Sequence, residues 1–185
     1  ITLKDGFDGF PGDVRVLATY RLSDENELFV EYRAESDKDT IFNPTNHVYF
    51  NLTGDFQQSV GEHQIRIAAN RYVPLGEDNL PIGVLEEVID TPFDFRNFAS
   101  FSQGFNSQHT QNLLVKGYDH PWILEDVATS VEVLSPDGKI KLSVVTNQPS
   151  VVIYTYNFPV EELAAFHGAF SLEYQGFPNA CNIDG

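Results

Sequence analysis

The sequence predicts an all-β fold, a large antiparallel β-sandwich with little or no helix. Apolar residues recur mainly with a period of two, and Gly and Pro residues interrupt the chain frequently. Several of the resulting segments are rich in β-branched and aromatic residues, which favour strands. We expect a single domain over residues 1–185. We also expect the chain to be an excerpt of a longer one, because it opens on Ile1 and contains no Met.

The first predicted strands belong to the N-terminal half. Residues 15–22 and 28–34 form an expected hairpin, joined through the polar segment 23–26. Residues 64–67 alternate strictly between polar and apolar side chains and form a further short strand. Residues 74–105 carry Pro at positions 74, 81 and 92, so we expect long loops with strand fragments there.

The C-terminal half contains the clearest turn. Residues 130–134 and 140–145 flank a Ser-Pro-Asp-Gly-Lys segment, and Asp-Gly supplies the positive φ angles of a tight reversal, so we predict a hairpin. Residues 151–156 are β-branched and aromatic, as in a buried central strand. Only residues 160–168 suggest a short helix, because they follow a Pro, carry two early Glu residues and end at a Gly.

Composition argues against several classes of function. With 185 residues, 42% of them hydrophobic, the chain can bury a sizeable core. A formal net charge of −16 argues against nucleic acid, anionic membranes and heavily phosphorylated substrates, so a neutral ligand is favoured. The single cysteine, Cys181, allows no internal disulfide and fits the cytoplasmic location that we expect. No apolar run approaches the length of a membrane span.

The first candidate site segment is Asn-His-Val-Tyr-Phe-Asn-Leu, residues 46–52, which places His47 among amide and aromatic side chains. Amide groups can match sugar hydroxyls, aromatic rings can cover the apolar face of a sugar, and a His can move a proton near neutral pH. A lone His is more often a hydrogen-bonded structural residue, so this segment alone leaves both interpretations open.

The second segment is Gly-Tyr-Asp-His-Pro-Trp, residues 117–122. Asp119 could accept hydrogen bonds from sugar hydroxyls, and Tyr118 or Trp122 could stack on a pyranose ring. The alternative is an aromatic loop in which Asp119 caps the backbone and Trp122 belongs to the core. His120 is expected to be structural.

The third segment, residues 171–175, contains Glu173 within an otherwise uncharged stretch from residue 166 to 183. We expect this carboxyl group to be partly desolvated, which favours its protonated form and suits a general base. The alternative is an exposed position on an alternating strand. The His residues are scattered without ligand spacing, so we expect no metal site, and no motif indicates a cofactor.

Together these segments resemble the galactose mutarotase (aldose 1-epimerase) family over nearly the whole chain. The resemblance is carried by residues 5–12, 43–52, 91–96, 117–120, 146–157 and 172–182. It implies a galactose mutarotase-like supersandwich with the sugar in a groove on one face.

The resemblance also implies roles for particular residues. Glu173 is the expected base that takes the proton of the anomeric hydroxyl, and His47 is the expected acid that protonates the ring oxygen. Asp119, Asn46 and Tyr49 are the expected substrate-binding residues. The implied activity is that of an isomerase, an aldose 1-epimerase that interconverts the α and β anomers of galactose or glucose without a cofactor, as a monomer or a homodimer.

The chain departs from the family pattern in three respects. The family also uses an Arg and a second His from an upstream segment, which would precede Ile1, and the end at Gly185 is early for the family. Where many relatives carry a Gln that contacts the sugar, this chain has Val152. Two other functions stay open, a glycoside-cleaving enzyme with Asp119 and Glu173 as its carboxylate pair, and a non-catalytic carbohydrate-binding sandwich. The acidic composition disfavours a hexose-phosphate substrate.

Overall fold

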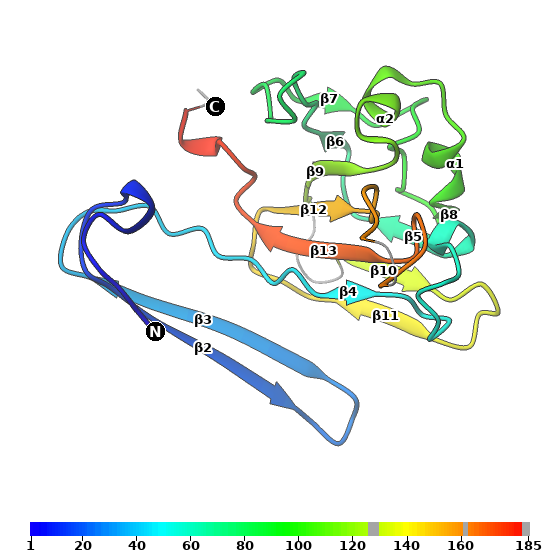
Figure 1. Ribbon diagram of the computed structural model, residues 1–185. Helices are drawn as coiled ribbons and strands as arrows, with labels where there is room; N and C mark the ends of the chain where they lie inside the picture. The colour runs from blue at the N-terminus through cyan, green and yellow to red at the C-terminus, as the bar shows by residue number, and fades with distance from the viewer. Residues whose placement is uncertain (126–129, 161–162, 183–185) are drawn as a thin grey trace. The chain divides into compact units, whose positions relative to one another are not determined.

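The computed structural model describes residues 1–125, 130–160 and 163–182. The chain divides into two compact units, residues 1–44 and residues 45–185 (Figure 1). Among the described residues, no helix is both long and apolar enough to cross a lipid bilayer.

The smaller unit is a three-stranded antiparallel sheet in the order β1-β2-β3. Its strands are β1 (Thr2–Leu3), β2 (Val14–Leu22) and β3 (Leu28–Ser36), and the 3-10 helix η1 (Phe7–Gly9) follows β1. The β2–β3 register is unbroken from Val14 to Leu22. The Ser23 hydroxyl closes the turn, because it accepts the backbone N–H groups of Glu25 and Glu27. The predicted hairpin is therefore confirmed.

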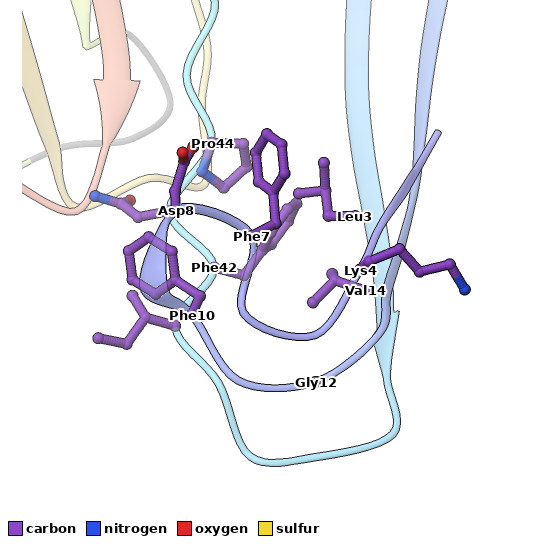
Figure 2. A pocket seen from close by; sticks show the side chains of 11 residues that line it. Leu3, Lys4, Phe7, Asp8, Phe10, Gly12, Val14, Phe42 and Pro44 are labelled. Atoms are coloured by element: carbon purple, nitrogen blue, oxygen red, sulfur yellow. The ribbon is translucent and has the colours of Figure 1, made fainter.

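This unit buries few of its side chains. Within β2 and β3 only Val14 is buried, at 6% exposure. A pocket of about 280 Å³ lies within the unit, with Phe7, Phe10 and Phe42 among its lining residues (Figure 2). Most of the residues that line this pocket are apolar, and the ionisable side chains among them are Lys4 and Asp8.

The larger unit is an antiparallel β-sandwich. Its six-stranded sheet has the order β4-β13-β12-β9-β6-β7, and its four-stranded sheet has the order β11-β10-β5-β8. The strands are β4 (Tyr49–Phe50), β5 (Gln64–Ile67), β6 (Arg71–Tyr72), β7 (Glu86–Glu87), β8 (Ala99–Ser100), β9 (Asp119–Ile123), β10 (Val131–Leu134), β11 (Lys141–Val144), β12 (Ser150–Tyr154) and β13 (Phe170–Gln175). The expected all-β class, the Asp-Gly hairpin between β10 and β11, and the central position of β12 are confirmed.

The two sheets share one core, because both contribute to the same cluster of buried side chains. The four-stranded sheet supplies Ile65, Ile67, Val131 and Val133, and the six-stranded sheet supplies Tyr72, Trp122, Val151, Ile153, Phe170 and Leu172. Successive residues of a strand point to opposite faces, so the alternate residues of β9, β12 and β13 lie on the outer face of the six-stranded sheet.

In the described part of the larger unit, helix is limited to short segments, namely α1 (Ser102–Phe105), α2 (Thr110–Val115) and the 3-10 helices η2 (Val60–Glu62) and η3 (Ala180–Asn182). The prediction of a helix over residues 160–168 is wrong for the described residues, 160 and 163–168, none of which is helical. His167 has a φ angle of 57°, and the Ala165 N–H donates to the Phe56 carbonyl across the fold, so the chain cannot continue as a helix there. Residues 161–162 lie outside the described residues. No sequence pattern predicted α1 or α2.

Candidate acid–base site

The strand register places the three predicted site segments on one face of the six-stranded sheet. Ser171 of β13 is paired with Tyr49 of β4 and with Tyr154 of β12, and Tyr154 is paired in turn with Asp119 of β9. Directly paired residues point to the same side of a sheet. Tyr49, Ser171, Tyr154 and Asp119 therefore form one row across the outer face.

A second row contains Glu173, which is paired with Val152, while Val152 is paired with Pro121. Extending the β4–β13 register by two residues sets His47 opposite Glu173. The side chains do meet there, since His47 Nε2 lies 3.0 Å from Glu173 Oε1. Residues that are 126 positions apart in the chain are thus brought into contact by sheet pairing.

Glu173 is buried, at 8% exposure, as expected from its uncharged surroundings. Its Oε1 atom also accepts a hydrogen bond of 2.8 Å from the Ser171 hydroxyl. The His47 side chain is about half exposed, at 48%. The pair therefore combines a carboxylate held in the sheet with an imidazole that solvent or a ligand can reach.

Asp119 lies on β9, on the same face as Glu173. Burial, followed by the negative charge of Glu173, raises the pKa of Asp119 to about 6, and the nearby His47 acts in the opposite direction. A carboxyl group in this range can exchange a proton near neutral pH or accept hydrogen bonds from a ligand. The structure thus groups His47, Glu173 and Asp119.

Aromatic rings surround the imidazole. The Tyr49 and His47 ring centroids are 5.0 Å apart, and those of Tyr154 and His47 are 6.2 Å apart. The pKa values of the Tyr49 and Tyr154 hydroxyls are raised, mainly because both are partly buried, so both hydroxyls stay neutral near pH 7. Tyr49 is still 40% exposed. Asn46 supports this segment, because its Oδ1 atom accepts the Val48 N–H at 3.2 Å.

A pocket of about 220 Å³ opens beside the two carboxyl groups. The sheet contributes Asp119, Pro121, Val152, Glu173 and Gln175, and the loops contribute Leu75, Asn79, Leu80, Pro81 and Pro178. The pocket therefore combines both carboxyl groups and two amide side chains with apolar residues, and the loop side is mainly apolar. This lining suits a small ligand that is polar but uncharged.

Gln111, which was not among the residues predicted from the sequence, holds the backbone of Leu75 in the loop side of this pocket. The side-chain amide of Gln111 donates to the Leu75 carbonyl at 3.0 Å, and its oxygen accepts the Leu75 N–H at 2.7 Å. His120 Nε2 lies 3.0 Å from the same Gln111 oxygen, while its Nδ1 atom accepts the Asp119 N–H. Burial lowers the pKa of His120 to about 3, so the ring is neutral and donates through Nε2. The expected structural role of His120 agrees with these contacts.

Asn51 anchors the His47 segment to the start of β13. Its Nδ2 atom donates to the carbonyl oxygens of Asp55, Gln58 and Gly168, each at 2.9 Å. The neighbouring Leu52 N–H donates to Nε2 of the buried His63 at 3.0 Å. These bonds hold the segment that carries His47 against the sheet.

The predicted ring-stacking role of Tyr118 or Trp122 is not supported, because both side chains are completely buried in the core. The Trp122 indole N–H donates to the Phe93 carbonyl at 3.0 Å, and the Tyr118 hydroxyl donates to the Pro92 carbonyl at 2.7 Å. The alternative is correct in placing Trp122 in the core, although the segment forms strand β9 (Asp119–Ile123) and not a loop. Among the described residues, no group of three or more His, Cys, Asp and Glu side chains could hold a metal ion.

The fold and the site together define a β-sandwich protein with an imidazole–carboxylate pair on one sheet face. The family described as aldose 1-epimerase matches residues 1–185. The chain is 39% identical to an aldose 1-epimerase of Haemophilus influenzae and 35% identical to human galactose mutarotase, with 96% of this chain covered in both cases. This chain therefore belongs to the aldose 1-epimerase family.

Solved structures agree with this assignment. A galactose 1-epimerase from Lactobacillus acidophilus superposes with a TM-score of 0.87 at 34% identity, covering 96% of this chain and 53% of that one. An aldose epimerase homologue from C. elegans gives the same TM-score at 28% identity, covering 100% of this chain and 57% of that one. The chain spans about half the length of the curated relatives it matches, 54% for the Haemophilus protein and 53% for the human one.

Proposed function

We propose that this chain carries the acid–base pair of an isomerase that interconverts the α and β anomers of a free aldohexose, galactose or glucose. The observation that supports the proposal most directly is the 3.0 Å contact between His47 Nε2 and Glu173 Oε1. A carboxylate and a protonated imidazole side by side can take one proton and give another within the same reaction. Family membership supports the same reaction type.

In the proposed mechanism the Glu173 carboxylate removes the proton of the anomeric C1 hydroxyl. The electron pair of that O–H bond forms the C1 carbonyl as the bond between C1 and the ring oxygen breaks. His47 in its protonated form supplies a proton to the departing ring oxygen. Rotation about C1–C2 and the reverse proton transfers close the ring on the other face, which restores both residues.

The other predicted site residues have supporting roles in this proposal. Asp119, which lines the pocket, binds a sugar hydroxyl, while Asn46 and Tyr49 bind the sugar from the side of His47, outside the described pocket lining. Tyr49 stays neutral near pH 7 and can cover the apolar face of the sugar ring. The apolar loop residues on the other side of the pocket exclude water from the reacting atoms.

The test is polarimetry on freshly dissolved α-galactose and α-glucose with the full-length protein. Replacing Glu173→Gln removes the base and keeps the side-chain size, so we expect the catalysed rate to fall by roughly 10²–10⁴-fold, the usual contribution of acid–base groups. Glu87→Gln is the matched control, because Glu87 is an exposed residue of β7 in the same sheet, outside the pocket lining. We expect Glu87→Gln to keep the wild-type rate.

A Glu173→Gln variant with undiminished activity would overturn the proposal. A wild-type protein that binds sugar but leaves the optical rotation decay unchanged would indicate a non-catalytic carbohydrate-binding sandwich instead.

A second candidate is glycoside cleavage with Asp119 and Glu173 as the acid and its partner. It is favoured by one observation, the pKa of Asp119 raised to about 6 by burial and by the charge of Glu173. A protonated carboxyl beside an ionised one is the arrangement that glycosidases use. Release of new reducing ends from galactosides or glucosides, lost in Asp119→Asn, would support this candidate, and intact glycosides would eliminate it.

A further inference from the structure

We propose that Ser171 is a positioning residue for Glu173: its hydroxyl holds Oε1 so that Oε2 is the oxygen that receives the proton from the sugar. This inference rests on the proposed anomer interconversion. It adds a role for Ser171, which was not among the site residues predicted from the sequence.

Ser171 is placed rigidly. It is completely buried on β13, and its backbone is paired on both sides, with Tyr49 of β4 and with Tyr154 of β12. Ser171 and Glu173 are two residues apart on one strand, so their side chains lie on the same face. The Ser171 hydroxyl donates to Glu173 Oε1 at 2.8 Å. A donor fixed in this way restricts the rotation of the carboxylate plane.

Both described polar contacts of Glu173 end on the same oxygen. Oε1 accepts from Ser171 and lies 3.0 Å from His47 Nε2, and among the described residues no hydrogen bond to Oε2 is found. A carboxylate oxygen has two lone pairs, so these two contacts use the acceptor capacity of Oε1. The proton of the C1 hydroxyl therefore transfers to Oε2. Oε1 keeps the hydrogen bond from Ser171 while the Nε2 proton of His47 moves to the ring oxygen.

The hydroxyl contacts the base on the side where other titratable groups gather. The titratable groups that face Glu173 are His47 and Tyr49 from the β4 side, Tyr154 from β12 and Asp119 from β9. A hydrogen bond that is donated to a carboxylate favours the charged form over the protonated one. Removing the Ser171 hydroxyl should therefore be visible in the pH dependence of the reaction.

The test is the pH dependence of mutarotation in Ser171→Ala, measured by polarimetry on the full-length protein. We expect kcat at neutral pH to fall roughly tenfold with KM changed by less than about twofold, because a hydrogen bond to a charged group is lost while the sugar contacts remain. The acid limb of the pH–rate profile should move up by about one pH unit, so the loss should shrink at alkaline pH.

Two further variants separate positioning from a purely structural effect. Ser171→Thr keeps a hydroxyl and should restore the position of the acid limb. Ser150→Ala removes another completely buried hydroxyl of the same sheet, one that donates to the Gln175 carbonyl at 2.6 Å and does not contact Glu173. We expect Ser150→Ala to leave the acid limb where it is.

The proposal fails if Ser171→Ala keeps the wild-type profile, or if it loses activity equally at every pH. A ¹³C NMR titration of the Glu173 carboxyl gives a readout that does not depend on turnover, with the midpoint expected to move upward in Ser171→Ala alone. A wild-type protein without mutarotase activity would refute the proposed function. An unmoved NMR midpoint would refute the role of Ser171.

Discussion

The two faces of the six-stranded sheet are built from alternate residues of the same strands, yet they differ in chemistry. The inner face carries Trp122, Ile153 and Leu172, which belong to the core shared with the second sheet. The outer face carries Glu173, which contacts His47, and Asp119, which lines the same pocket as Glu173. Neighbouring positions in the sequence thus serve stability and proposed chemistry in turn. Substitutions on the two faces should therefore affect different measurements.

The largest expected effect on stability comes from the inner face. Trp122 is completely buried among aromatic rings, so Trp122→Ala should lower the free energy of unfolding by about 3–5 kcal/mol. Urea unfolding followed by circular dichroism measures this change. The milder Trp122→Phe keeps a ring but loses the hydrogen bond to the Phe93 carbonyl. Its free energy of unfolding should therefore lie between the values for the wild type and for Trp122→Ala.

If the two faces are functionally separate, the folded fraction of Trp122→Phe should keep the wild-type kcat. A variant that unfolds normally but has lost its activity would show that the inner face also shapes the site. The two faces would then not be functionally separate.

The next largest effect on stability is expected on the outer face, where a substitution should stabilise the protein. Folding raises the pKa of Asp119 to about 6 from its ordinary value of 3.8, so the unfolded chain releases this proton first as the pH rises. Stability is therefore lost between about pH 4 and pH 6. Asp119→Asn removes this loss and should stabilise the protein at pH 7 by at most about 3 kcal/mol, while it weakens sugar binding.

Unfolding at pH 4.5, 5.5 and 7 tests the sign. Asp137→Asn is the control, because hydrogen bonds from Ser135 and the Lys139 backbone lower the pKa of Asp137 to about 2. A lowered carboxyl pKa stabilises the protein above the unfolded pKa, and this stabilisation is lost in acid. Asp137→Asn should therefore destabilise at pH 7. Parallel pH profiles for wild type and Asp119→Asn would contradict the prediction.

The smallest effect is expected at Val152, an apolar residue of the outer face that is only 5% exposed. It is paired with Glu173 and with Pro121 and lines the pocket. Val152→Thr keeps the shape and adds a hydroxyl, so we expect KM for galactose and glucose to change by less than about tenfold with kcat retained, since no proton-transfer group is removed. Steady-state kinetics on both sugars measures this, and a large fall in kcat would place Val152 in the catalytic machinery.

Local patterns predicted six strands, namely β2, β3, β5, β10, β11 and β12, because alternation and the Asp-Gly turn depend on neighbours in sequence. The uncharged surroundings of Glu173 likewise predicted its burial. The contact between His47 and Glu173 could not be derived from local patterns, since it depends on β4 pairing with β13 across the whole unit. The aromatic residues of segment 117–122 were ambiguous for a related reason, because a ring suits a core and a sugar site equally well.

Local sequence patterns were also insufficient to predict the helices. The Pro, Glu and Gly signals around residues 160–168 favour a helix locally, but Ala165 bonds to Phe56 across the fold instead. The four residues of α1 lie within the stretch expected to be loops, and they are too few to produce a periodic pattern.

Asn51, Leu52 and Thr53 also form an acceptor sequence for N-linked glycans, which would be attached to the Nδ2 atom of Asn51. In the fold that nitrogen donates to three carbonyl oxygens. A glycan there would replace an N–H hydrogen and separate the His47 segment from β13. If this chain were produced in a glycosylating secretory host, modification at Asn51 and correct folding would therefore exclude each other.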